Sequence, residues 1–178
     1  TADMAIMTCK MLNPEKIDGI DISVGMLELG RKKIEKEQLI HKIELHTGDS
    51  ETIKFADNTF DAVMVAFGVR NFENLEKGLN EMKRVLKPGG MLVVLEFSRP
   101  AGPFRWIYQF YMQRLAPGIG KLFSKNREAY QYLHSSVKTF PEGNTFLHIL
   151  EQVGFHETSL NRLSLGICTI YCGRKKQV

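Results

Sequence analysis

Hydrophobic residues along this chain alternate between strand-like and helix-like spacing. After a helical segment at 2–12, residues 16–22 alternate as a strand and are followed by Ser23, a suitable N-cap for the next helix. The same two patterns then repeat along the chain. They predict strands at 43–47, 60–66 and 91–97, helices at 73–86 and 145–153, and a closing pair of strands at 157–163 and 167–172.

This order of elements predicts an α/β fold. Residues 60–66 form a nearly continuous apolar run, which is typical of a strand covered on both faces, as in a parallel sheet flanked by helices. The run Pro88-Gly89-Gly90 is expected to end the helix before it. The last two strands are expected to close the sheet as an antiparallel hairpin around residues 164–166.

Composition narrows the class of protein. The 178 residues are 43% hydrophobic and 25% charged with a net charge of +4, as in one globular domain, 1–178, with a real core. No apolar run is long enough to span a membrane and the start lacks a secretory signal, so we expect a cytoplasmic protein. The mild charge without a basic stripe argues against nucleic-acid binding. The three cysteines, whose spacing suits no metal knuckle, are expected to be reduced thiols: Cys9, Cys168 and Cys172.

Residues from about 100 to 138 break the alternating pattern and are expected to form a helical cap. Six of the chain's aromatic residues lie between Phe104 and Phe123. A core or lid is the ordinary interpretation of such a cluster. An amphipathic patch around Trp106 and Phe110, with Arg105 and Arg114 nearby, also suits peripheral contact with a membrane interface.

Two aspartates follow predicted strands, where ligands bind in open α/β sheets. Asp21 suits the acid that accepts hydrogen bonds from ribose hydroxyls, and Asp49 with Ser50 suits the adenine side. Taken singly, either aspartate is more often a helix cap or turn residue. A ribose-binding acid fits NAD and S-adenosylmethionine alike, but the visible chain has no GxGxxG, P-loop, GxSxG or HExxH motif.

Five fragments stand in a characteristic order along the chain: Gly19-Ile20-Asp21-Ile22-Ser23, Asp57-Asn58-Thr59-Phe60-Asp61, Phe67-Gly68-Val69-Arg70-Asn71, Arg84-Val85-Leu86-Lys87-Pro88-Gly89-Gly90 and Leu95-Glu96-Phe97-Ser98. With them the chain resembles, from residue 1 to about residue 173, the S-adenosylmethionine-dependent C-methyltransferases of quinone biosynthesis. Those enzymes convert demethylmenaquinol to menaquinol or methylate a ubiquinol precursor.

The resemblance implies roles for the residues of the cofactor site. Thr1 aligns with the threonine of the first cofactor motif, Asp21 with the ribose acid, and Asp49-Ser50 with the adenine-side pair. Ala66 and Asp49 stand where ubiquinone-type members often have serine and asparagine. These differences favour the menaquinone branch.

The resemblance also implies a Rossmann-like class I methyltransferase fold with a seven-stranded, mostly parallel sheet. In that fold the first strand and its glycine loop precede the residue equivalent to Thr1, between the strand ending at Asp21 and the one ending near Ala66. We therefore expect an N-terminally incomplete chain with two unpaired strand edges.

A methyl transfer of this kind needs an electron-rich ring carbon and no metal. Arg70, with Asn71, is expected to stabilise a quinol phenolate, although such a pair after a strand is usually a solvated cap or ion pair. Tyr132 and His134, in the predicted cap, are expected to relay the proton. The products are then the methylated quinol and S-adenosylhomocysteine.

Two other functions stay open at this point: methylation of another small acceptor, and an inactive binding module that keeps the fold. The sequence is compatible with a homo-oligomer and does not set the oligomeric state. The remaining histidines show no ligand spacing, so no metal site is expected.

Overall fold

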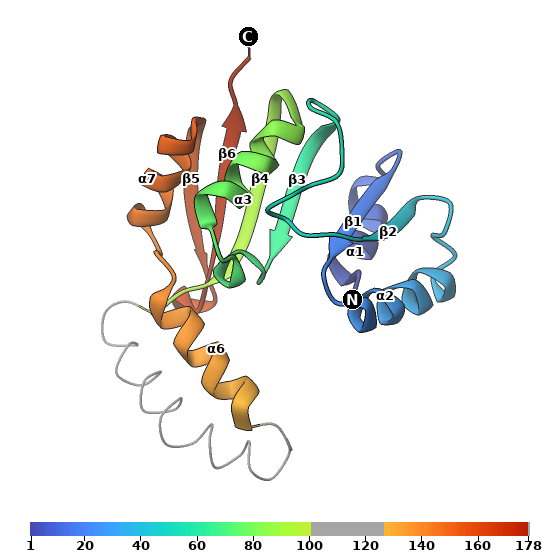
Figure 1. The fold of residues 1–178 in the computed structure, drawn as a ribbon, viewed down its shortest axis with the longest axis horizontal. Helices are drawn as coiled ribbons and strands as arrows, with labels where there is room; N and C mark the ends of the chain where they lie inside the picture. Colours follow the sequence, from blue (N-terminus) through green and yellow to red (C-terminus); the bar gives the residue numbers. More distant parts are fainter. Residues whose placement is uncertain (101–126, 178) are drawn as a thin grey trace. The chain divides into compact units, whose positions relative to one another are not determined.

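The computed structural model describes residues 1–100 and 127–177 of the chain. These residues divide into two compact units, Thr1–Ala56 and Asp57–Val178, which Figure 1 colours from blue to red along the sequence. Each unit has its own sheet and its own hydrophobic core. Most of the predicted cap, including the aromatic patch around Trp106, lies outside the described residues.

The first unit is a strand–helix–strand motif with one additional helix at its start. Helix α1 (Asp3–Leu12) precedes strand β1 (Ile17–Asp21), helix α2 (Val24–Lys36) and strand β2 (Ile43–Thr47). The two strands are parallel, with Ile17 opposite Ile43 and Asp21 opposite Thr47. Both strands therefore end at the same edge of this sheet, where loops can carry a ligand site.

A small core holds the first unit together. Its buried members are Ile6 and Cys9 of α1, Ile34 of α2 and Ile43 of β2. Gly30 allows α2 to approach its neighbours closely, because a Cβ atom at this position would lie 2.8 Å from Leu45 Cδ1. The start of the chain packs at the same point, since that Cβ would also lie 3.2 Å from the Cβ of Ala2.

The second unit is built on a four-stranded sheet in the order β3-β4-β6-β5. Strands β3, β4 and β5 run in one direction, whereas β6 is antiparallel to its neighbours β4 and β5. Helices α3 and α7 contact each other and cover β4 and β5 (Figure 1). The elements of this unit are β3 (Phe60–Ala66), the 3-10 helix η1 (Val69–Asn71), α3 (Leu75–Val85), β4 (Leu86–Phe97), α6 (Arg127–Thr139), α7 (Asn144–Val153), β5 (Phe155–Leu163), the 3-10 turn η3 (Ser164–Gly166) and β6 (Cys168–Lys175).

The core of the second unit lies between this sheet and helices α3 and α7. Leu79 of α3, Leu92 and Val94 of β4, and Phe146 and Leu150 of α7 are completely inaccessible to solvent. Alternate residues of β4 are buried, in agreement with the predicted strand over 91–97. Burial of large apolar side chains on this scale is the main source of stability of such a unit.

One boundary was predicted wrongly. Pro88-Gly89-Gly90 was expected to separate a helix from a strand that begins at Met91, but α3 ends at Val85 and β4 begins at Leu86. The pairing with β3 is irregular at this point, where Phe60 pairs with Leu86 and Ala62 with Met91. Proline and a glycine with positive φ, here Gly89 at 78°, are tolerated in such a bulge.

The structure agrees with the other predicted elements to within a few residues. The closing strands form an antiparallel hairpin around Ser164–Gly166, and Ser23 is the N-cap of α2, its Oγ accepting a hydrogen bond from Met26 N at 3.4 Å. Six strands lie within the described residues, and among them β1 pairs only with β2 and β3 only with β4. The seventh strand and the single domain stay predictions.

Candidate functional site

The residues predicted to bind the cofactor, Thr1 apart, lie at the carboxyl edge of the two-stranded sheet. Asp21 is the last residue of β1, and Gly48 N, just after β2, donates to the carbonyl oxygen of Asp21 at 3.1 Å. This bond brings the loop of Asp49 and Ser50 beside Asp21. The two aspartates predicted from the sequence are therefore at neighbouring strand ends, as the ligand site of an α/β sheet requires.

Asp21 is oriented by its own loop. Its Oδ1 accepts a hydrogen bond from Ser23 N at 2.8 Å, and the residue is half-buried. Within the part of the chain that the structure describes, Oδ2 has no hydrogen-bond partner. A fixed carboxylate with one oxygen available is the geometry needed to accept hydrogen bonds from sugar hydroxyls.

Asp49 lies at a small pocket with apolar walls. The pocket has a volume of about 210 Å³ and is lined by Ile20, Ile53 and Phe55 together with Asp49 and other residues of this edge. Asp49 Oδ1 accepts from Glu51 N at 2.8 Å, which fixes the carboxylate at the start of the loop. Apolar walls with a few polar groups suit a flat heteroaromatic ring such as adenine.

Thr1 belongs to a different set of contacts. Its hydroxyl donates to Asp3 Oδ2 at 2.7 Å, and Asp3 in turn pairs with Lys33 of α2. The ion pair with Lys33 holds the pKa of Asp3 below its ordinary value. Among the described residues no hydrogen bond joins Thr1 to Asp21, Asp49 or Ser50.

Two of the predicted catalytic residues, Arg70 and Asn71, lie on the turn that follows β3. Phe67 adopts a left-handed conformation with φ of 57°, which is uncommon for an aromatic residue and is typical of strained functional sites. Its backbone N donates to Leu95 O at 2.8 Å, and its ring stacks on that of Phe97 with centroids 4.4 Å apart. The turn is therefore tied to the end of β4 by both backbone and side chain.

Arg70 points into the protein and forms an ion pair. Its Nη1 lies 2.8 Å from Glu96 Oε1, with side-chain exposures of 11% for Arg70 and 0% for Glu96. The same Nη1 donates to Phe67 O, and the guanidinium lies 5.3 Å from the centre of the Phe97 ring. Its Nε is buried and is the one buried side-chain nitrogen or oxygen in the described residues that lacks a hydrogen-bond partner.

Asn71 and Tyr132 are brought together although they are 61 positions apart. The Tyr132 hydroxyl on α6 donates to Asn71 Oδ1 at 2.9 Å, and both side chains are exposed. His134 is also on α6, two residues further along, and its side chain lies outside the described part of the structure. Thus the structure joins two of the four predicted catalytic residues directly.

Sequence reasoning gave Glu96 no role. The sequence does contain a signal for it, since Glu96 is the single carboxylate in the otherwise apolar run 91–97. An acidic residue in a buried strand is almost always paired with a cation or with several donors. The run was recognised only as a strand and as part of the family resemblance. The identity of the partner, Arg70, depends on the fold.

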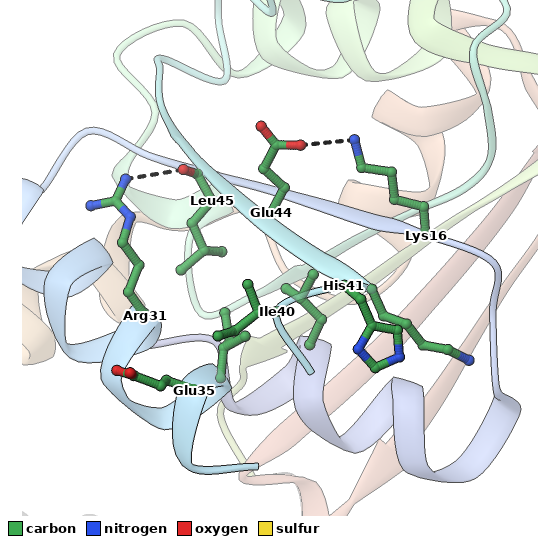
Figure 2. A pocket seen from close by; sticks show the side chains of 10 residues that line it. Lys16, Arg31, Glu35, Ile40, His41, Glu44 and Leu45 are labelled. Atoms are coloured by element: carbon green, nitrogen blue, oxygen red, sulfur yellow. Dashed lines mark hydrogen bonds and ion pairs between the residues drawn. The ribbon is translucent and has the colours of Figure 1, made fainter. Parts of the chain in front are cut away.

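A second pocket, larger than the one beside Asp49, lies elsewhere in the first unit. Its volume is about 500 Å³, and Figure 2 shows Ile40, His41 and Leu45 around it, with Arg31 donating to the carbonyl oxygen of Leu45. Lys16 reaches Glu44 across the same region, with Nζ 2.9 Å from Oε2 (Figure 2). None of the predicted site residues lines this pocket.

One group of residues has metal-ligating types. The ligand atoms of Asp18, Glu44 and His46 lie within 4.8 Å of one another. The ammonium of Lys16 is 3.4 Å from Asp18 and 2.9 Å from Glu44, so a lysine already supplies positive charge to both carboxylates.

None of the helices in the described parts of the chain is long and apolar enough to cross a bilayer.

Comparison with solved structures defines the class of fold. The chain aligns with an S-adenosylmethionine-dependent methyltransferase of Thermotoga maritima, a possible histamine N-methyltransferase, at a TM-score of 0.62 and 19% identity, over 94% of this chain and 76% of that one. It also aligns with phosphoethanolamine N-methyltransferase 2 of Haemonchus contortus at a TM-score of 0.69 and 14% identity, over 97% of this chain and 46% of that one. The fold is that of class I S-adenosylmethionine-dependent methyltransferases.

Sequence comparison then gives the family. The model of the ubiE/COQ5 methyltransferase family matches residues 1–175. A demethylmenaquinone methyltransferase of Bacteroides fragilis is 47% identical over 98% of this chain and 72% of the relative. A ubiquinone/menaquinone biosynthesis C-methyltransferase of Geobacter sulfurreducens is 44% identical over 98% of this chain and 69% of the relative. The chain belongs to the ubiE/COQ5 methyltransferase family, which confirms the resemblance seen in its sequence.

Proposed function

We propose that this protein transfers the methyl group of S-adenosylmethionine to a ring carbon of a prenylated quinol, with demethylmenaquinol as the substrate. Membership of the ubiE/COQ5 family supports the reaction class. The names of relatives at 47% and 39% identity, both demethylmenaquinone methyltransferases, support the substrate. A ubiquinol precursor is the alternative, because the Geobacter relative is named for both quinones.

On the cofactor side, we assign the ribose to Asp21 and the adenine to the loop of Asp49 and Ser50. The available oxygen of Asp21 suits the ribose hydroxyls, and the pocket with Ile53 and Phe55 suits the ring. Thr1 keeps its proposed place in the first cofactor motif. When bound, the cofactor supplies an electrophilic methyl group that needs no further activation.

On the substrate side, the hydrogen bond between Tyr132 and Asn71 is the observation that carries the proposal. Because Asn71 Oδ1 accepts from the Tyr132 hydroxyl, the amide orientation is fixed and Nδ2 presents two N–H donors elsewhere. A quinol oxygen that loses its proton becomes a phenolate, whose charge spreads to the ring carbon that is methylated. A donor fixed in advance, such as Asn71 Nδ2, stabilises that oxygen.

Arg70 contributes positive charge behind this donor. The carboxylate of Glu96 offsets much of that charge, so Arg70 acts on the substrate more weakly than an unpaired cation would. Its Nε is buried and has no hydrogen-bond partner in the described residues, so the N–H at this atom is not part of the proposed contact with the substrate. His134 stays our proposed partner of Tyr132 in removing the quinol proton.

A prenylated substrate also implies contact with lipid. We propose that the protein meets the membrane surface peripherally, through the aromatic patch that lies outside the described residues. Flotation with liposomes tests this contact, and absence of binding with both neutral and anionic lipids would contradict it. Whether the protein forms a homo-oligomer is a separate question, which its mass in solution answers.

The reaction itself is tested by methyl transfer from labelled S-adenosylmethionine to two acceptors, demethylmenaquinol and a ubiquinol precursor. We expect labelled menaquinol, identified by its mass. Turnover of the ubiquinol precursor alone would reverse the choice of branch. Cofactor binding without a product from either acceptor would indicate a different acceptor or an inactive protein.

A further inference from the structure

Glu96 is an ionisable side chain that the protein buries completely. It is the second-last residue of β4, with 0% of its surface exposed, on the same face of the strand as the buried Val94. An isolated carboxylate in such surroundings is strongly disfavoured unless donors surround it. The donors that contact the Glu96 carboxylate therefore indicate its role.

Within residues 1–100 and 127–177, the hydrogen bonds of the Glu96 carboxylate come from two residues. Arg70 supplies its Nη1 at 2.8 Å and its backbone N at 3.3 Å, while Phe97 supplies its backbone N at 2.9 Å. One carboxylate thus links the strand end at Phe97 to both the main chain and the side chain of Arg70. The turn 67–71 is held at the end of β4 at more than one point.

Arg70, which Glu96 holds in place, is the immediate neighbour of Asn71. Val69, Arg70 and Asn71 form the 3-10 helix η1, in which Asn71 N donates to Gly68 O at 3.0 Å. Displacement of the Arg70 backbone, whose N donates to Glu96, therefore moves Asn71, and Asn71 accepts the hydrogen bond from Tyr132 on α6. The contacts run without a break from Glu96 through Arg70 and Asn71 to Tyr132.

We propose that Glu96 is a positioning residue for methyl transfer: its buried carboxylate fixes Arg70, and through Arg70 it fixes the Asn71 amide that binds the quinol oxygen. This inference rests on the proposed function. Glu96 itself does not touch the substrate. A displacement of about 1 Å in a group that orients the reacting atoms lowers the rate by up to about a hundredfold, so loss of this anchor reduces turnover.

The first test is the variant Glu96→Gln, which keeps the shape of the side chain and removes its charge. We expect kcat for demethylmenaquinol to fall by about tenfold or more, while KM for S-adenosylmethionine changes by less than about twofold. Thr169→Val is the matched control. Thr169 is 1% exposed, lies opposite Glu96 on β6 and donates to Ser98 Oγ at 2.8 Å. The Thr169→Val variant therefore loses a buried hydrogen bond that does not involve Arg70. Its kcat is expected to stay within about twofold.

The second test asks whether Glu96 acts through Arg70. The turnover of Arg70→Gln is compared with that of the double variant Glu96→Gln with Arg70→Gln. If Glu96 acts only by holding Arg70, the double variant is no slower than Arg70→Gln alone. Losses that multiply, or a Glu96→Gln enzyme with the wild-type kcat, would overturn the proposal.

A third readout does not depend on the substrate. Tyr132 is replaced by 3-fluorotyrosine and its fluorine resonance is recorded in the wild-type, Glu96→Gln and Thr169→Val proteins. We expect Glu96→Gln to shift this resonance and Thr169→Val to leave it in place. If the wild type methylates neither quinol, the proposed function fails, and this resonance still decides whether Glu96 controls the position of Tyr132. An unchanged resonance in Glu96→Gln would refute that control.

Discussion

The two units hold their site residues in different ways. In Thr1–Ala56, the two aspartates assigned to the cofactor are each oriented by a backbone N–H two positions away, Asp21 by Ser23 and Asp49 by Glu51. In Asp57–Val178, Arg70 is oriented by Glu96, which is 26 positions away and completely buried. Local turns therefore orient the residues that we propose bind the cofactor, whereas the folded core orients those that we propose bind the substrate.

The two units also differ in how completely they bury their hydrophobic side chains. The described residues have thirteen large hydrophobic side chains that are exposed, and nine of them belong to the smaller first unit: Met4, Met7, Met11, Leu12, Ile22, Val24, Met26, Leu29 and Ile40. Among the described residues, the largest side chains with exposure below 2% all belong to the second unit. Substitutions on the substrate side should consequently affect stability and activity together, and those on the cofactor side should affect affinity alone.

The largest effect is expected for Arg70→Gln, because it leaves the buried Glu96 carboxylate without its cation. Loss of one partner of a buried pair costs about 3–5 kcal/mol of the free energy of unfolding. The control is Arg99→Gln, whose pair with Glu142 has the same 2.8 Å separation at 48% exposure of the arginine side chain. There the expected loss is below about 1 kcal/mol. Denaturant titration of both variants measures the difference, and equal losses would contradict it.

The next effect is on cofactor affinity. Asp21→Asn keeps the acceptor for Ser23 N but loses the charge, so binding of S-adenosylmethionine should weaken by about 1.5–3 kcal/mol, roughly tenfold or more. Calorimetric titration gives the affinity, and thermal unfolding should be nearly unchanged. Asp61→Asn is the control, since Asp61 is exposed and pairs only with Lys87 among the described residues. A stability loss as large as that of Arg70→Gln would remove the contrast between the units.

A smaller effect is expected for Tyr132→Phe, which removes the hydrogen bond to Asn71 and leaves the ring. The expected decrease in kcat is a few-fold, from about 0.5–1.5 kcal/mol for one hydrogen bond. Ser135→Ala serves as the control on the same helix, because the Ser135 hydroxyl, in the described structure, bonds only to the Tyr132 carbonyl oxygen. Equal kcat values for the Tyr132→Phe and Ser135→Ala enzymes would show that the Asn71 contact does not matter for turnover.

The smallest effect concerns alkaline pH and the buried Tyr171. Burial raises the pKa of Tyr171 above its ordinary value of 10.0, although a hydrogen bond from Gly143 N at 2.7 Å opposes this. The folded protein therefore binds this proton more tightly than the unfolded chain, and the stability it contributes is present below about pH 10 and is lost as pH rises through the folded pKa. Tyr171→Phe should show a shallower decrease in stability above pH 10. Parallel curves for the two proteins would contradict this.

Much of the cofactor side could be predicted from the sequence because its structure is local. The spacing around Ser23 indicated both the end of β1 and the start of α2, and the positions of Asp21 and Asp49 followed from strand ends. The Asp49 pocket could not be predicted, since its wall includes Ile53 and Phe55, which the sequence pattern does not assign to any element.

The substrate side was predictable only in part. The family resemblance identified Arg70, Asn71 and Tyr132, yet it gave no orientation for any of them. That Arg70 turns inward to Glu96, while Asn71 meets Tyr132, depends on how β4 and α6 lie against the turn after β3. The boundary at Pro88 was missed because a β-bulge and a helix stop use the same residues.

The place of β6 in the sheet has a consequence for synthesis of the protein. β6 lies between β4 and β5, although it follows both in the sequence, and its partner Phe97 in β4 is paired with Cys168. A chain that emerges from the ribosome therefore makes β3, α3 and β4 well before β4 can acquire its second neighbour. During that interval an apolar strand edge, with Leu92 and Val94 beside it, is open to wrong partners. Slow folding and a need for chaperones during translation are the expected result of this strand order.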